Sequence, residues 1–210
     1  LANLRPLLRP DDQHYTVDER VLPALRAEVP NDPSAFGLQN TAENHHRLNR
    51  FRRLAESFRT PPPPPNQELI WQIVHGEFMG PNLLYDDEAA KITGELDFES
   101  AQPDYRVRDF ADALLRIATD LGPMFWATAR ACVEGYNAHA QLTRPEIELM
   151  PRFMVESQAG RILRYAAQGR PAHASSALRT QEEISAWLEV EAERLQNMLR
   201  GVFLNERFEV

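Results

Sequence analysis

The chain's 210 residues and 43% apolar content are sufficient for one globular domain with a substantial core. A formal net charge of −8 argues against broad nucleic-acid binding, which depends on cations that neutralise phosphates, and favours a neutral or cationic small-molecule partner. A single cysteine, Cys132, excludes an internal disulfide or a thiolate cluster, and no apolar run approaches the roughly 18 residues of a membrane span. The composition therefore predicts a cytoplasmic protein with neither nucleic acid nor membrane as a partner, and Cys132 as a small core residue.

A helix is predicted over residues 43–58, "ENHHRLNRFRRLAESF". Its apolar residues recur at helical spacing: Leu48, Phe51, Ala55 and Phe58. Arginines occupy its other faces, and the adjacent pair His45 and His46 invites a nucleic-acid or metal-binding interpretation. We favour a solvated helix face for this basic run. Nearer the start, a Thr16-x-x-Glu19 capping pattern predicts a further short helix.

Five consecutive prolines at 61–65 exclude a helix interior or a central strand and favour extended polyproline II geometry. We therefore predict a proline-rich linker over 61–66. It separates a helical segment over 1–60 from a larger segment over 67–210.

Three short strands are predicted after the prolines. "ELIWQIVHG" is rich in strand-forming residues, and "NLLYDD" and "KITGELDF" are joined by a polar turn. Together they are predicted to form a small hairpin-like sheet.

From Arg106 onward the pattern is helical. The first helix carries an apolar stripe of Phe110, Leu114, Ile117 and Leu121 and ends at Gly122-Pro123; the second is "MFWATARACVEGYNAHA". A third begins at a Thr143-x-x-Glu146 capping box and stops near Gly169. The last begins at a second box, Thr180-x-x-Glu183, and its core residues are Ile184, Trp187, Leu188, Leu195 and Leu199. The predicted fold class is α+β, mainly α, with a small β-hairpin insert.

The insert carries four polar residues at spacings that suit phosphoryl transfer: His75, Glu77, Asn82 and Asp97. This reaction needs one carboxylate to orient the attacking hydroxyl and another, beside a neutral amide, to hold Mg²⁺ against the nucleotide phosphates. Protein kinases place the base and the amide five residues apart in His-x-Asp-x-x-x-x-Asn, and the metal-binding Asp follows on the next hairpin. An ordinary hairpin with acidic turn residues is the alternative. We favour the phosphoryl-transfer interpretation because all four positions and the order of elements agree.

The stretch "VHGEFMGPNLLYDDEAAKITGELDFESAQPDYRVRDFADALL" resembles the core of the superfamily of aminoglycoside phosphotransferases, choline kinases and type II homoserine kinases. Its members typically read close to His-Gly-Asp-x-x-x-x-Asn followed by Ile-Asp-Phe-Glu. "EGYNAHAQLTRPEIELMP" also resembles the Gly-Tyr segment and the next helix of those kinases. The resemblance covers roughly Trp71 to Arg164 and implies a protein-kinase-like fold, with 1–60 and 67–210 forming one C-terminal lobe.

The resemblance also implies residue roles. Asn82 and Asp97 would bind Mg²⁺ and, through it, ATP or GTP, and Glu77 would occupy the catalytic-base position. His75 would be a structural histidine that braces the loop. Asp109 would anchor the catalytic loop by hydrogen bonds. The implied activity is transfer of the terminal phosphate of a nucleoside triphosphate to a hydroxyl of an aminoglycoside-like or small metabolite acceptor.

Two departures from the family pattern alter these expectations. Glu77 is one methylene longer than Asp, a displacement of about an ångström that can cost roughly 10²-fold in rate. The only lysine, Lys91, lies on the hairpin of the metal residue, so the phosphate-clamping Lys of a β-rich N-terminal lobe has no counterpart. Nor is there a Gly-rich loop, and "LANLRPLLRP" looks like the helix that follows the interlobe hinge. We therefore expect the N-terminal lobe to be absent and these residues alone to be inactive.

A different class of function is compatible with Glu77: a catalytically silent binding or regulatory module that kept the kinase scaffold. The missing lobe could also have been removed or be disordered. Glu99 follows the metal motif at a position where this superfamily often has an acidic residue, and its role stays open.

Other polar residues have both a functional and a simpler interpretation. Three carboxylates could line an acidic substrate pocket, although solvated carboxylates are commoner: Glu95, Asp104 and Glu156. For Tyr136 and His139 we favour packing over ligand binding. A helical turn separates Arg161 from Arg164, and the pair could bind an anionic substrate group, but an exposed face is the default.

Overall fold

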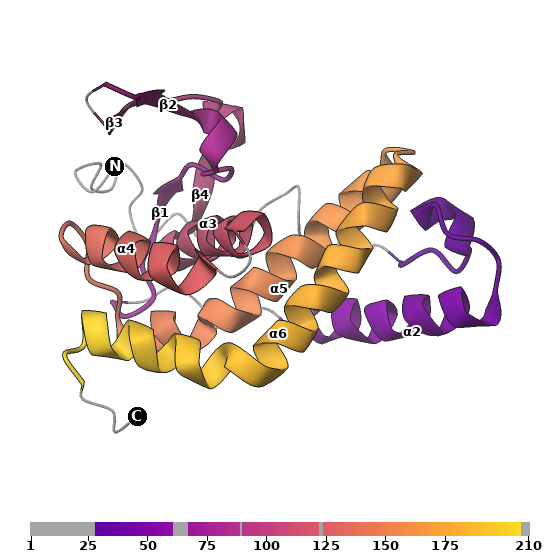
Figure 1. Cartoon of the computed structure of the whole chain (residues 1–210). Coiled ribbons are helices and arrows are strands. Elements are labelled where there is room, and N and C mark those ends of the chain that lie inside the picture. The colour runs from indigo at the N-terminus through magenta and orange to yellow at the C-terminus, as the bar shows by residue number, and fades with distance from the viewer. Residues whose placement is uncertain (1–27, 61–66, 89, 122–123, 207–210) are drawn as a thin grey trace. The chain divides into compact units, whose positions relative to one another are not determined.

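The computed structural model describes residues 28–60, 67–88, 90–121 and 124–206, and of 117–121 only the backbone (Figure 1). The elements in chain order are η1 (Pro33–Phe36), α2 (Ala42–Ser57), β1 (Trp71–Val74), η2 (Gly80–Asn82), β2 (Leu83–Asp86), β3 (Lys91–Glu95), η3 (Phe98–Ser100), β4 (Gln102–Tyr105), α3 (Arg106–Leu121), α4 (Phe125–Asn137), α5 (Arg144–Ala167) and α6 (Pro171–Phe203). The described part is mainly helical with small antiparallel sheets, as predicted. None of its helices is long and apolar enough to cross a membrane.

The described residues form two compact units. One unit contains 67–150 and 194–206, and the other contains 28–60 and 151–193. Both α5 and α6 therefore contribute to both units. The predicted linker 61–66, the short helix at Thr16 and the segment "LANLRPLLRP" lie outside the described residues, so the predicted domain boundaries stay predictions.

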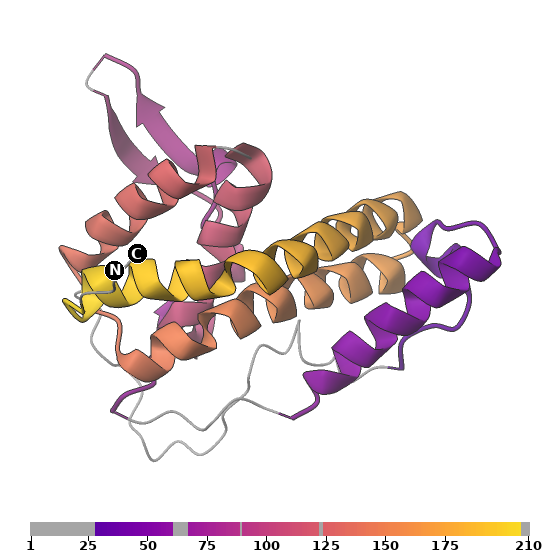
Figure 2. The same ribbon diagram turned by 60° about the horizontal axis from the view of Figure 1, so that its bottom comes forward.

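The second unit is built on α2 and on the parts of α5 and α6 that lie beside it (Figure 2). The predicted stripe of α2 is confirmed, because its four apolar residues are buried: Leu48, Phe51, Ala55 and Phe58. They pack against Ile162 of α5 and Leu178 of α6 in one apolar cluster. Thr41 caps α2 by accepting a hydrogen bond from the N–H of Asn44.

The basic face of α2 does not lie free in solvent along its whole length. Arg47 and Arg50 both bind the carboxylate of Glu182 on α6, at 2.9 and 3.2 Å, and Arg52 donates to the side chain of Asn31. The predicted solvated face is thus partly a set of ion pairs that are still accessible to solvent, each of which contributes only modestly to stability.

The first unit carries the strands. β2 pairs with β3 in the predicted hairpin, but β1 pairs instead with β4, a strand that the sequence pattern did not reveal. In that second sheet Trp71 lies opposite Tyr105 and Ile73 lies opposite Pro103. β1 and α3 meet at this sheet, so the loop that follows β1 begins beside the first turn of α3.

Within the described residues the helix predictions hold except at the start of the last helix, where in addition Trp187 and Leu188, predicted as core residues, are only half-buried. Phe110 and Leu114 of α3 are buried as predicted, whereas the side chains of Ile117 and Leu121 lie outside the described residues. The capping box at Thr143 is confirmed, since the Glu146 N–H donates to the Thr143 hydroxyl and the Thr143 N–H donates to the Glu146 carboxylate. α5 ends at Ala167, just before Gly169, as expected.

The predicted start of the last helix at Thr180 is wrong. α6 begins at Pro171, and the Thr180 hydroxyl donates to the Ser176 carbonyl one turn earlier, within the helix. Ala174, Ala177 and Leu178 are buried on one face of the preceding turns, so helix propensity and packing extend the helix upstream of the apparent box.

Candidate phosphoryl-transfer site

The second residue of the loop that follows β1 must be glycine. Gly76 has φ +80°, and a Cβ atom added there would lie 2.4 Å from the Ser100 carbonyl oxygen. The loop therefore passes against the backbone of η3, the segment that follows Asp97. Only a residue without a side chain fits this approach.

Asp109 holds the start of this loop from the first turn of α3. Its carboxylate accepts hydrogen bonds from the N–H of His75 at 3.1 Å and of Gly76 at 2.9 Å. Burial raises the pKa of Asp109, and these two hydrogen bonds oppose the rise. The contacts are those that the predicted anchoring role requires.

His75 joins the predicted catalytic loop to the predicted metal loop. Its ring, 1% exposed as a residue, places Nε2 at 2.9 Å from the Leu96 carbonyl oxygen and Nδ1 at 3.2 Å from the Glu77 N–H. A carbonyl can only accept and an N–H can only donate, so the proton lies on Nε2. The ring also packs on Phe98, at 4.7 Å between centroids. His75 thus contacts both loops, and its bracing role stays a prediction.

Asn82 and Asp97 are brought together by the backbone. The Leu96 N–H donates to the Asn82 carbonyl at 2.8 Å, and Asp97 is the next residue. The Asn82 side-chain amide donates to the Glu77 carbonyl at 2.9 Å, which leaves its Oδ1 as the acceptor atom. Asp97 is exposed, has φ +63° and makes no capping hydrogen bond to η3.

An amide oxygen and a carboxylate suit Mg²⁺, which prefers oxygen ligands and keeps several waters or phosphate oxygens in its shell. Among the described residues there is no group of three or more His, Cys, Asp or Glu that could hold a metal ion alone. The donor set of Asn82 and Asp97 therefore fits a cation that arrives with phosphate groups better than a resident structural metal.

Glu77 lies on a backbone that is fixed on both sides. Its N–H donates to His75, and its carbonyl accepts from Asn82. The residue is half-buried. These hydrogen bonds restrain the backbone, so we expect the extra methylene of Glu77 to displace its carboxylate rather than the backbone.

The structure reveals a further residue beside the loop that sequence reasoning missed. Arg116 of α3 donates to the sulfur of Met79 at 3.1 Å and pairs with Asp112 at 2.9 Å. The spacing of four residues between Asp112 and Arg116 is the only sequence signal for this pair. Asp109, Asp112 and Arg116 thus form a polar face of α3, of which Asp109 and Arg116 contact the loop.

Two of the other three candidate carboxylates form ion pairs within the fold. Asp104 of β4 is buried and pairs with Arg108, and Glu156 is buried and pairs with Arg152, so the expectation of solvated carboxylates is wrong for both. Glu95 is half-buried on β3. These ion pairs give no support to a role of Asp104 or Glu156 in a substrate pocket.

The remaining candidates are explained mainly by packing or exposure. Tyr136 stacks on Phe110 with ring centroids 4.4 Å apart, and burial raises its pKa to about 12. His139, Lys91 and Glu99 are exposed.

Two arginines and the cysteine complete this set. Arg161 donates to Gln158, and Arg164 is half-buried. Burial raises the pKa of the half-buried Cys132 thiol, which disfavours the reactive thiolate, as expected for a packing residue.

A family model described as "Phosphotransferase enzyme family" matches residues 18–142, which is more than half of the chain. The chain therefore belongs to the phosphotransferase enzyme family. The match includes β1, the hairpin and α3, and hence the whole candidate site. No curated protein matches the chain.

Proposed function

We propose that the protein transfers the terminal phosphate of a nucleoside triphosphate, ATP or GTP, to a hydroxyl of a small metabolite or an aminoglycoside-like acceptor. Family membership supports phosphoryl transfer as the class of reaction. The observation that carries the proposal is the junction of the two loops, where the hydrogen bond from Leu96 to Asn82 puts Asn82 beside Asp97.

In this proposal the chain's residues position the reactants. Glu77 orients the acceptor hydroxyl and accepts its proton, while Asn82 and Asp97 hold Mg²⁺. When bound, Mg²⁺ neutralises charge on the phosphate oxygens. Asp109 and His75 fix the backbone that carries these groups.

We also propose that the described elements correspond to the C-terminal lobe of a protein-kinase-like fold. The order of loop, hairpin and helix supports this correspondence. Lys91 is exposed at the start of β3, on the same hairpin as the metal residue. A phosphate-clamping lysine would therefore have to come from a part of the kinase fold outside these residues.

The test is a phosphotransfer screen on the intact gene product that contains these residues. ATP and GTP are offered with Mg²⁺ and pooled acceptors: aminoglycosides, amino-alcohols, hydroxy-amino acids and sugars. Asp97→Ala is expected to abolish the transfer, and Asp87→Ala, at an exposed position of the hairpin turn, is the matched control. Transfer retained by Asp97→Ala would refute the assigned role.

Glu77 favours a second candidate, a catalytically silent binding or regulatory module, because the family resemblance puts Asp at this position. Glu77→Asp distinguishes the two. A loss of transfer shows a site tuned around Glu, and a large gain shows an impaired enzyme. A wild type and a Glu77→Asp variant that are both inactive with every acceptor pool support the silent module.

A further inference from the structure

Both ends of β1 are held by the first turn of α3. At the start of the strand, the backbone N–H of Arg106 donates to the Ile70 carbonyl at 3.1 Å. At its end, Asp109 accepts from His75 and Gly76. The loop that follows β1 is called the phosphoryl-transfer loop below. Its position therefore depends on the contacts between β1 and this first turn of α3.

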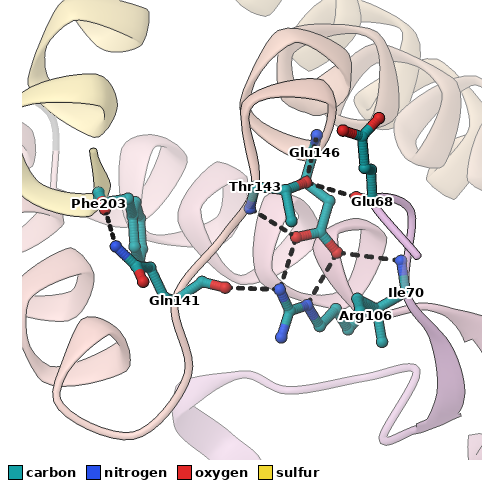
Figure 3. Close-up of polar contacts among 7 residues, drawn as sticks. All are labelled: Glu68, Ile70, Arg106, Gln141, Thr143, Glu146 and Phe203. Carbon is teal, nitrogen blue, oxygen red and sulfur yellow. Dashed lines mark hydrogen bonds and ion pairs between the residues drawn. The ribbon is translucent and has the colours of Figure 1, made fainter.

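The contacts at the start of β1 include a buried carboxylate from another helix. Glu146, 0% exposed in the first turn of α5, accepts from the Ile70 N–H at 3.3 Å. It also forms two hydrogen bonds with the Arg106 guanidinium, at 2.8 and 2.7 Å (Figure 3). Arg106 in turn donates to the Gln141 carbonyl. One side chain thus joins α5, α3 and the residue that precedes β1.

Both oxygens of Glu146 are fully used. Oε1 accepts from Arg106 and the Ile70 N–H, and Oε2 accepts from Arg106 and the Thr143 N–H at 2.9 Å. All four groups are donors, so only a bare carboxylate satisfies them. A glutamine amide would turn its NH₂ group toward two donors in either orientation.

A helix cap alone does not explain this arrangement. The capping box accounts for the contact with Thr143, but a cap needs neither the guanidinium nor the Ile70 N–H. A buried carboxylate also carries a desolvation cost that a neutral cap would avoid. The additional contacts, with Arg106 and the Ile70 N–H, lie at the start of β1, the strand that directly precedes His75.

We propose that Glu146 is a positioning residue for the phosphoryl-transfer loop, acting through Arg106 and Ile70 on β1. The proposal rests on the proposed function for its effect on turnover. Its effect on the loop itself can be measured without any substrate.

The experiment compares Glu146→Gln with Ile147→Ala in the intact gene product. Ile147 is the neighbouring residue in the same turn of α5 and is also 0% exposed, but its side chain has no polar atom that could join this hydrogen-bond network. The amide hydrogen exchange of His75 and Gly76 is measured under native conditions. Breaking a buried ion pair is strongly destabilising, so Glu146→Gln is expected to accelerate their exchange by about tenfold or more beyond Ile147→Ala.

Glu146→Asp provides a second variant if Glu146→Gln does not fold. It keeps the charge but withdraws the carboxylate from Ile70, and the same acceleration is expected in weaker form. Exchange at His75 and Gly76 no faster than in Ile147→Ala would overturn the proposal. Exchange of β2 and β3 is expected to change little, since the donors to the Glu146 carboxylate, Ile70, Arg106 and Thr143, lie in neither strand.

Steady-state kinetics separates this proposal from the proposed function. A displaced loop lowers kcat and raises the KM for Mg·ATP, because the loop also carries Asn82, whereas general destabilisation lowers only the amount of active protein and leaves KM unchanged. Faster exchange with a lowered kcat supports both statements. Faster exchange in a protein whose wild type transfers no phosphate supports the positioning of the loop and refutes the proposed function.

Discussion

Gly76 is the residue at which the loop leaves no room for a side chain. Gly76→Ala would force a methyl group to 2.4 Å from the Ser100 carbonyl and would also impose a positive φ on alanine. We expect a loss of about 1–3 kcal/mol in the free energy of unfolding, together with loss of activity. Urea denaturation measures the first effect.

Gly135→Ala is the matched control. Gly135 lies within α4, and a Cβ atom there would meet nothing within 4 Å. Alanine should therefore stabilise the helix by up to about 1 kcal/mol. Equal effects of the two substitutions would show that the close approach at Gly76 is not a real constraint.

Asp109 predicts a pH dependence of stability with a definite sign. Burial raises its folded-state pKa above the ordinary value of 3.8, so the folded protein binds this proton more tightly than the unfolded chain. The contribution of Asp109 to stability is therefore full below about pH 3.8 and declines as the pH rises through the folded-state pKa. Asp109→Asn removes this titration.

The measurement is the difference in unfolding free energy between wild type and Asp109→Asn, from urea titrations at a series of pH values. The difference should fall as the pH rises from about 4 and then become constant. A difference that grows with pH would mean that the two hydrogen bonds from the loop outweigh burial.

At the residue level, spacing along the chain pointed to residues that the structure brings close together, and their roles stay predictions. His75, Asn82 and Asp97 lie on consecutive loops, so their spacing alone brings them to one junction. Contacts between residues that are distant in sequence leave no such spacing pattern. Glu146 looked like an ordinary capping residue, because its contact with Arg106 exists only once α5 packs beside α3.

Among the elements, the start of α6 can be tested by whether a threonine substitution lowers or raises the stability of the protein. Thr41 is a true helix cap, whereas Thr180 lies in the middle of α6 and donates to Ser176. Thr41→Ala should cost about 1 kcal/mol, and Thr180→Ala should be neutral or stabilising by a few tenths of a kcal/mol. Thermal unfolding of both variants tests this, and destabilisation by Thr180→Ala would restore the helix start predicted from sequence.

β4 shows why one strand was missed. Its sequence, "QPDY", contains a proline and an aspartate, both of which are rare in strands. Pro103 is tolerated because β4 is one strand of a two-stranded sheet. Asp104 is tolerated because its carboxylate pairs with Arg108 in the next helix. Tertiary partners, not local propensity, therefore determine this strand.

For the whole molecule, composition and helical periodicity predicted the fold class, but not the division into two units. The sequence shows α5 and α6 as two ordinary helices. Ile147 of α5 and Leu195 of α6 are nevertheless buried in the first unit, while Ile162 and Leu178 belong to the core of the second. The apolar periodicity of a helix does not show that its two halves are buried in different cores.

This sharing predicts that the two units unfold together. Phe51, 3% exposed, packs edge-on against Phe36 in the second unit, and Phe51→Ala should cost about 3–5 kcal/mol. Loss of this core would release α5 and α6, which also supply buried side chains to the first unit. Hydrogen exchange should therefore accelerate in β1 and α3 as well as in α2, and Leu114→Ala in the first unit should have the reciprocal effect on α2. If Phe51→Ala left the protection of β1 and α3 at the wild-type level, the units would be independent and this expectation wrong.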